Sequence, residues 1–196
     1  DDKLLSVDLL FSLDNIITIA NYSPDILTKK VNIADLGAGW GGNGYIITKI
    51  NPKASYSIFD LPEGLNVAQH YLPFVTENKN FLCFNKKLKT INQKVLEEND
   101  INFFGSQQLE IVENKLFNYF INVQSFQEMT SKQIKEYFKL IDKKTNGYFY
   151  TKNYFNWFNP LDKMHIGLSN YPWMSKWKKV LLDKSQNFQN HFVAIF

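Results

Sequence analysis

A glycine-rich segment, ADLGAGWGGNG, contains the residues whose types and spacing point most directly to chemistry. Glycines spaced in this way let a backbone turn tightly and approach a bound ligand closely. The G-x-G-x-x-G turn that holds dinucleotides is matched by Gly37, Gly39 and Gly42. The acid-x-G-x-G-x-G turn that opens domains binding S-adenosylmethionine (SAM) is matched by Asp35, Gly37, Gly39 and Gly41. The glycines alone leave both cofactors open.

Two carboxylates near this turn favour SAM. Asp60 ends the second predicted strand, where it can accept hydrogen bonds from both ribose hydroxyls of either cofactor. Asp35 stands two residues before the first glycine, and we expect its side chain to point toward the mouth of the turn. A carboxylate there is unfavourable beside a pyrophosphate but favourable beside SAM, whose amino group and sulfonium are cationic. All 22 basic residues are Lys, so no Arg is present to hold the phosphates of a dinucleotide. An NAD-dependent oxidoreductase remains the alternative.

The other residues expected at the cofactor follow the ends of predicted strands, because ligands bind beyond the carboxyl ends of strands in an open parallel sheet. We take 101–105 as the third strand, which places the adenine between Leu61 and the residues that end this strand. The alternative third strand is 81–84, which would place the adenine against Cys83 and Asn85. The complete predicted cofactor set is Asp35, Gly37, Ala38, Gly39, Gly41, Asp60, Leu61, Phe104, Gly105, Ser106, Gln107, Asn122 and Gln124.

Methyl transfer from SAM needs an aligned acceptor and a base that removes a proton from it. The segment QSFQEM follows the predicted strand 117–123, at the position where the methyl group is expected in such a sheet. The strand lacks the N-P-P-Y motif that holds a planar amine, and no Cys lies in the loop, which argues against N-methylation and against C5-methylation of cytosine. We expect Ser125 and Gln127 to bind a hydroxyl-bearing acceptor.

Few side chains can serve as the base for a hydroxyl. Glu128 and His165 are the candidates. The alternative for Glu128 is a helix cap or an ion pair with Lys132, and the alternative for His165 is a surface position. His70 and His191 are interpreted as structural. The histidines and carboxylates are too scattered to predict a metal site.

Aromatic residues are concentrated between positions 150 and 177. Sugars present flat C–H faces that stack on such rings, so this enrichment suits a carbohydrate cleft, and packing in the core is the alternative. We expect at least half of the rings to be structural, Trp157 and Trp173 to be exposed, and Tyr154, Trp157 and Trp173 to bind the acceptor. The rings are Tyr150, Tyr154, Phe155, Trp157, Phe158, Tyr171, Trp173 and Trp177.

Strands that alternate with helices must position these residues. Apolar runs predict strands at 31–37, 54–60, 101–105, 117–123, 148–153 and 191–196. Helical patterns predict helices at 44–50, 62–72, 85–100 and 131–144. Thr130 and Gln133 form a capping box, and the glycine of TNG at 145–147 predicts a helix C-cap. This order predicts an α/β fold with a mostly parallel, Rossmann-like sheet and helices on both faces.

Composition restricts the class of protein. With 196 residues, 44% of them apolar, the chain suits one domain, which we divide into an N-terminal helical cap at 1–30 and a cofactor-binding domain at 31–196. A net charge of +3 from scattered Lys argues against nucleic acid as a partner. The sequence has no apolar run of membrane-spanning length, and its single Cys83 suits the cytoplasm. The first residue is Asp, so we expect that upstream residues are missing, and the sequence does not predict an oligomeric state.

Three segments, IADLGAGWGGNGYII, YSIFDLPEGLNVAQHYL and FNYFINVQSFQEMT, together resemble the sugar O-methyltransferases of bacterial surface-polysaccharide clusters. The resemblance spans about residues 31–155, and D-L-P and S-F-Q-E-M are its distinctive parts. It implies a class I SAM-dependent methyltransferase fold, SAM as the cofactor and a sugar or glycan hydroxyl as the acceptor. The alternatives are methylation of another small hydroxyl-bearing metabolite and a non-catalytic, partner-binding module of the same fold.

Overall fold

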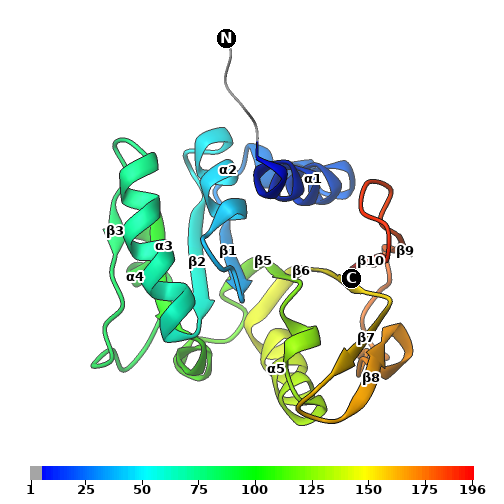
Figure 1. Cartoon of the computed structure of the whole chain (residues 1–196). Coiled ribbons are helices and arrows are strands. Elements are labelled where there is room, and N and C mark those ends of the chain that lie inside the picture. Colours follow the sequence, from blue (N-terminus) through cyan, green and yellow to red (C-terminus); the bar gives the residue numbers. More distant parts are fainter. Residues whose placement is uncertain (1–5) are drawn as a thin grey trace.

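The computed structural model describes residues 6–196, with an eight-stranded sheet at its centre and helices on both sides (Figure 1). The strand order is β3-β4-β2-β1-β5-β6-β10-β9. The strands from β3 to β6 in this order are parallel, and β10 and β9 are antiparallel to their neighbours. The strand bounds are β1 (Asn32–Leu36), β2 (Ser55–Asp60), β3 (Phe81–Leu82), β4 (Ile101–Gly105), β5 (Phe117–Val123), β6 (Thr145–Tyr154), β9 (Leu181–Lys184) and β10 (His191–Ile195). The mostly parallel sheet expected from the sequence is confirmed.

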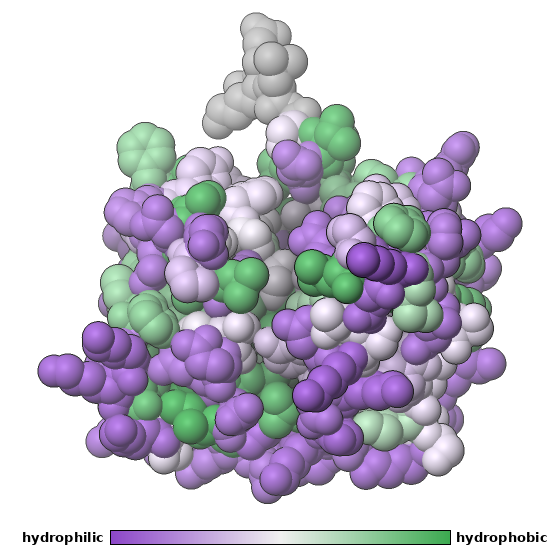
Figure 2. All heavy atoms as spheres, turned by 60° about the horizontal axis from the view of Figure 1, so that its bottom comes forward, coloured by the Kyte–Doolittle hydropathy of each residue, from purple (hydrophilic) through white to green (hydrophobic). Residues whose placement is uncertain are grey.

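Helices and short turns connect the strands. The α-helices are α1 (Val7–Tyr22), α2 (Gly42–Ile50), α3 (Pro62–Val75), α4 (Gln93–Glu97) and α5 (Ser131–Lys144). The 3₁₀ turns are η1 (Pro24–Leu27), η2 (Ser106–Ile111), η3 (Phe126–Glu128) and η4 (Leu168–Asn170). A separate hairpin consists of β7 (Asn156–Asn159) and β8 (Met164–Gly167). In the face that Figure 2 shows, hydrophilic side chains predominate around a central recess, and apolar side chains form small separate patches.

Successive strand residues enter two apolar clusters, one on each side of the sheet, because side chains of a strand alternate between its faces. Ile33 and Ile58 pack with apolar residues of α1, α2 and α3. Their neighbours Ala34 and Phe59 pack with apolar residues of α4 and α5 on the opposite side. Both faces of the sheet are therefore covered, and the strands read as nearly continuous apolar runs.

Local signals set several helix ends as predicted. The Thr130 hydroxyl accepts a hydrogen bond from the Gln133 N–H (3.3 Å), and the Gln133 side chain accepts one from the Thr130 N–H (2.9 Å), so the capping box is confirmed. Pro62 occupies the first turn of α3. The N-terminal helical cap is present as α1 and η1, whereas residues 1–5 of the predicted cap lie outside the described residues.

Three predictions of secondary structure are wrong. The helix expected at 85–100 is restricted to α4, which begins after an Asn92 cap. The glycine of TNG at 145–147 is not the helix cap, because Thr145 is the C-cap of α5 and β6 begins at the same residue. A Cβ on Gly147 would lie 2.1 Å from the Asn118 carbonyl oxygen, so this glycine permits close approach to β5. The third error is an omission, since the sequence patterns did not predict the β7–β8 hairpin or β9.

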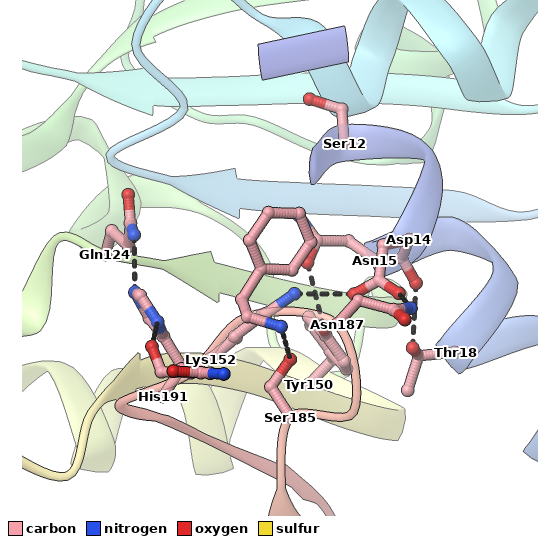
Figure 3. A network of polar contacts seen from close by, with 12 residues as sticks. Ser12, Asp14, Asn15, Thr18, Gln124, Tyr150, Lys152, Ser185, Asn187 and His191 are labelled. Atoms are coloured by element: carbon pink, nitrogen blue, oxygen red, sulfur yellow. Dashed lines mark hydrogen bonds and ion pairs between the residues drawn. The ribbon is translucent and has the colours of Figure 1, made fainter. Parts of the chain in front are cut away.

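A buried ion pair anchors α1 to β6. The Lys152 side chain is fully buried, and its ammonium lies 2.6 Å from the Asp14 carboxylate, as Figure 3 shows. The same ammonium lies over the rings of Phe11 (4.2 Å) and Phe188 (4.3 Å). Burial lowers the pKa of Lys152, and Asp14 acts in the opposite direction. The cationic form therefore depends on its counter-ion.

This anchor generates a stability prediction. Asp14→Asn leaves a buried ammonium without a counter-ion, and we expect the free energy of unfolding to fall by about 3–5 kcal/mol. The double variant with Lys152→Met removes both charges and should recover much of the loss. Glu136→Gln, which breaks the exposed Lys139–Glu136 pair (2.8 Å), is the matched control and should change stability by less than about 1 kcal/mol. Denaturant unfolding measures all three, and equal effects of the two single variants would contradict the anchoring role.

Candidate functional site

The glycine turn after β1 lies at the switch point of the sheet. β1 has β2 on one side and β5 on the other, and the later strands extend from it in both directions. Gly37, Gly39 and Gly41 have φ values of +74°, +58° and +88°. These angles lie in the left-handed region, where side chains other than glycine are strained. A Cβ on Gly39 would meet nothing within 4 Å, so the exposed centre of the turn faces open space.

The turn is fixed to the loop after β5. A Cβ on Gly37 would lie 2.3 Å from the Ser125 Cβ, so the two backbones can meet only because Gly37 has no side chain. The Leu36 carbonyl accepts hydrogen bonds from the Ser125 hydroxyl (3.0 Å) and from the Asn122 amide (3.1 Å). Asn122 is fully buried, and its oxygen accepts from Asn153 (3.0 Å). The Asn122 side chain therefore holds the two loops together, and a cofactor contact by this residue stays a prediction.

Asp60 closes the other side of the turn. Its Oδ2 accepts a hydrogen bond from the Gly39 N–H (2.8 Å), and its Oδ1 accepts one from the Leu61 N–H (2.7 Å). Burial raises the pKa of this half-buried carboxyl, and the two N–H donors act in the opposite direction. Each oxygen retains a lone pair for a further donor. Leu61 is exposed beside Asp60, at 62%.

Only some of the residues predicted to surround the adenine are accessible to a ligand. Gly105 pairs with Asp60 in the sheet, so 101–105 is the third strand of the central parallel set, and β3 is a short edge strand beyond it. Ser106 and Gln107 follow, half-buried and exposed. The Phe104 side chain is 1% exposed and packs against Phe59, with ring centroids 5.2 Å apart, so the ring does not form an exposed wall.

Asp35 lies beneath the glycine turn rather than at its mouth, which corrects the predicted orientation. It is 1% exposed, and its Oδ2 accepts hydrogen bonds from the Tyr56 hydroxyl (2.5 Å) and the Asn43 amide (3.1 Å). Its buried Oδ1 has no hydrogen-bond partner within residues 6–196. Burial raises the pKa of Asp35 to about 6, against the two hydrogen bonds.

The Asp35 pair continues into a buried network that reaches α1. The Asn43 oxygen accepts a hydrogen bond from the Asn15 amide (3.1 Å), and the Asn15 oxygen accepts one from the Tyr150 hydroxyl (2.9 Å). Figure 3 shows Asn15 of α1 beside Tyr150 of β6. The first helix, the glycine turn and the sheet are therefore joined by polar contacts as well as by packing.

Only part of the aromatic segment faces a possible acceptor. Tyr154 stacks between Trp157 (5.0 Å between ring centroids) and His191 (4.1 Å), and Trp157 is 39% exposed as predicted. Trp173 is a wrong prediction. Its ring packs against Phe138 (5.5 Å), its indole N–H donates to the Leu168 carbonyl (3.0 Å), and it belongs to the second apolar cluster.

Gln127 and Glu128 have different surroundings in η3. Gln127 is 5% exposed, and its side-chain oxygen accepts a hydrogen bond from the Tyr154 N–H (3.3 Å), so the side chain joins η3 to β6. Glu128 is exposed, and its carboxylate makes no hydrogen bond or ion pair with residues 6–196. The Glu128 N–H donates to the Ser125 carbonyl (3.1 Å).

The structure separates His165 from these residues. Phe158 pairs with His165 across the β7–β8 hairpin, whereas Trp157 pairs with the buried Ile166. Because side chains alternate along a strand, His165 lies on the hairpin face opposite Trp157. Its Nδ1 is 2.8 Å from the Asn156 side-chain oxygen. The structure therefore does not bring His165 together with Trp157, and its catalytic role stays a prediction.

His191 is the residue that the sequence analysis missed. It begins β10, which is antiparallel to β6, so His191 pairs with Tyr154 at the edge where the parallel strands end. Its Nε2 lies 2.6 Å from the Gln124 Nε2, and Gln124 itself has a positive φ of +53°. The direction of the last strand determines this position, and the sequence analysis did not predict that direction.

Two further properties concern residues 6–196. No three His, Cys, Asp or Glu side chains gather there in a way that could hold a metal ion. No helix in that range has both the length and the apolar character needed to cross a membrane.

Comparison with known proteins identifies the fold. No protein-family model and no curated protein sequence matches this chain. The structure is similar to the PH0226 protein from Pyrococcus horikoshii OT3, with a TM-score of 0.67 and 12% identity over 97% of this chain and 91% of that chain. It is also similar to a SAM-dependent methyltransferase from Aquifex aeolicus, with a TM-score of 0.56 and 13% identity over 93% and 88% of the two chains. The chain therefore has the Rossmann-like fold of class I methyltransferases, as its sequence resemblance implied.

The buried Asp35 generates a prediction of pH dependence. The folded state retains the Asp35 proton up to about pH 6, whereas the unfolded chain releases it near the ordinary carboxyl pKa of 3.8. Stability attributable to this group is therefore fully present below pH 3.8 and is lost as the pH rises to about 6, a difference of roughly 3 kcal/mol. Asp35→Asn should flatten this part of the profile, because an amide does not titrate. Denaturant unfolding from pH 4 to pH 7 measures both proteins, and parallel profiles would contradict the assignment.

Proposed function

We propose that this protein is a SAM-dependent O-methyltransferase that acts on a sugar or a sugar-linked acceptor in the cytoplasm, in the synthesis of bacterial surface polysaccharide. The observation that carries the proposal is the glycine turn at the switch point, with Gly39 facing open space beside the Asp60 carboxylate. The resemblance of the sequence to sugar O-methyltransferases supports the acceptor class.

The residues at the turn suit SAM. Gly37, Gly39 and Gly41 give the backbone the close approach that the methionine end requires, and the remaining lone pairs of Asp60 can accept the ribose hydroxyls. Leu61 and the segment 105–107 would flank the adenine. Asp35 Oδ1 is a buried oxygen without a partner beneath the turn, so the local charge favours a cationic ligand over a pyrophosphate.

When bound, SAM supplies an electrophilic methyl group. The protein then has to align an acceptor oxygen, exclude water and remove the hydroxyl proton. Gln124 lies in the loop after β5, next to Ser125, which contacts the glycine turn. The Tyr154 ring stacks on Trp157 and also contacts His191, which lies against Gln124 of this loop. The exposed Trp157 ring can stack on the C–H face of a sugar.

The cofactor assignment is tested by calorimetry with SAM, S-adenosylhomocysteine and NAD. We expect the first two to bind and NAD not to bind. Asp60→Ala removes a charge-assisted acceptor worth about 1.5–3 kcal/mol, so affinity for S-adenosylhomocysteine should fall about ten- to a hundredfold. Asp183→Ala is the matched control, because its exposed carboxylate also accepts the next N–H (2.7 Å) but lies on β9.

A second substitution tests whether the position of the Asp60 carboxylate matters. A Cβ on Gly64 would lie 2.6 Å from the Asp60 carboxylate, so Gly64→Ala must displace this group without changing its chemistry. Alanine favours a helix over glycine by about 1 kcal/mol, so a loss of affinity would not reflect a weaker α3. We expect at least a roughly tenfold loss. Binding of NAD alone, or unchanged affinity in both site variants, would contradict the assignment.

The acceptor class is tested with methyl-labelled SAM and a panel of hydroxyl compounds. The panel contains free sugars, nucleotide sugars and methyl glycosides, with phenols and hydroxy acids as the comparison set. We expect a labelled methyl ether on a sugar, and Trp157→Ala should raise the KM for it by about tenfold or less, since stacking contributes about 0.5–1.5 kcal/mol. Label transferred only to phenols or hydroxy acids would contradict the sugar assignment, and cofactor binding without transfer to any compound would support a non-catalytic module.

A further inference from the structure

The hydrogen bonds of His191 determine which ring nitrogen carries the proton. Nδ1 lies 3.1 Å from the Gln189 carbonyl oxygen, and Nε2 lies 2.6 Å from the Gln124 amide nitrogen. A carbonyl oxygen only accepts and an amide NH₂ only donates, so Nδ1 donates and Nε2 accepts. With the Gln124 amide in this orientation, the two contacts correspond to a neutral imidazole that carries its proton on Nδ1 and directs the Nε2 lone pair at the loop after β5.

The groups packed around His191 favour the neutral form. Burial lowers its pKa, and the Lys152 ammonium of β6 acts in the same direction. The Asp14 carboxylate of α1 is paired with Lys152, and within residues 6–196 no carboxylate forms an ion pair with His191. Tyr154 of β6 covers one face of the ring (4.1 Å), and Phe11 of α1 meets it edge to face (5.9 Å).

The partner of this nitrogen belongs to the loop that contacts the glycine turn. Gln124 is adjacent to Ser125, and Ser125 contacts Gly37 of the glycine turn. Figure 3 shows the Gln124 amide pointing at the imidazole. Nε2 therefore already has a hydrogen-bond donor, the amide of Gln124, which directly precedes Ser125 in the chain. The exposed Glu128 carboxylate and the outward-facing His165 have no comparable orientation.

We propose that His191 is the general base of the reaction, a role that rests on the proposed function. The acceptor hydroxyl takes the place of the Gln124 amide as the donor to Nε2. As the O–H bond breaks, Nε2 gains the proton and the oxygen electron pair forms the new bond to the methyl carbon. The electron pair of the former C–S bond leaves with the sulfur, and the imidazolium then returns its proton to water. Such a base contributes about a hundred- to ten-thousandfold in rate.

The first test uses the wild-type protein and does not depend on turnover. Nitrogen-15 NMR of the histidine rings, with and without S-adenosylhomocysteine, reports the tautomer and the pKa of each imidazole. We expect His191 to carry its proton on Nδ1 at neutral pH and to have a pKa below the ordinary value of a histidine, because the ring is buried. A proton on Nε2 at neutral pH would overturn the proposal, because the nitrogen facing the loop could not then act as a base.

The second test compares variants. His191→Asn and His191→Gln keep a hydrogen-bonding side chain but remove the basicity. We expect both to bind S-adenosylhomocysteine like the wild type and to lose about a hundred- to ten-thousandfold in kcat on the hydroxyl compound that the panel identifies. The wild-type kcat should fall as the pH decreases through the His191 pKa, with Lys152 and Asp14 as the neighbouring charges, and this dependence should disappear in the variants. His70→Asn, on the outer face of α3, is the matched control and should not change kcat.

The possible outcomes separate this inference from the proposed function. Loss of kcat in Glu128→Gln or His165→Asn, with kcat retained in the His191 variants, would overturn the role of His191 and leave the methyltransferase assignment intact. A wild-type protein that binds neither SAM nor S-adenosylhomocysteine would instead overturn the proposed function. If both His191 variants melt early, the tautomer and pKa of the wild-type imidazole decide the question.

Discussion

The contact between Gly37 and Ser125 determines how the functional edge of this sheet is built. At this point the loops after β1 and β5 meet, and a Cβ on Gly37 would lie 2.3 Å from that of Ser125. Ser125 and Asn122 both donate to the Leu36 carbonyl, so the end of β1 is held by side chains from the β5 segment. A larger residue at 37 would separate the two halves of the sheet at its switch point and displace both the glycine turn and Gln124. The geometry of the cofactor side and that of the acceptor side therefore depend on one close backbone approach.

Buried polar groups extend this constraint to the first helix. Asp35, Asn43, Asn15 and Tyr150 connect β1, α2, α1 and β6 through hydrogen bonds in the interior. Such groups are costly unless they are paired, so each one specifies where its partner must be. The Lys152–Asp14 pair adds a second fixed point between α1 and β6. The helix is thus positioned by specific partners, whereas apolar packing alone would allow it to shift along the sheet.

The features that the sequence predicted correctly are those that depend on local signals. The glycine turn, the strands at its sides, the Thr130–Gln133 capping box and the place of Asp60 at the end of β2 all follow from residues close together in the chain. The orientation of Asp35 could not be predicted, because it depends on Tyr56, a partner 21 residues away. Trp157 and Trp173 have the same residue type but different neighbours, so only the fold distinguishes the exposed ring from the packed one. His191 was missed because its position depends on the direction of the last strand, which no local pattern determines.

The placement of β10 has a consequence for the order in which the molecule is assembled. All residues that shape the glycine turn precede position 126, whereas His191 arrives on a strand that inserts between β6 and β9. During synthesis the ribosome therefore releases the complete cofactor side well before the imidazole that faces it. A nascent chain can close the turn around its ligand while β6 still lacks its antiparallel neighbour. The pairing of β6 with β10 spans a long stretch of chain, and such non-local contacts form slowly. The glycine turn and the β6–β10 edge are thus completed at different times during synthesis.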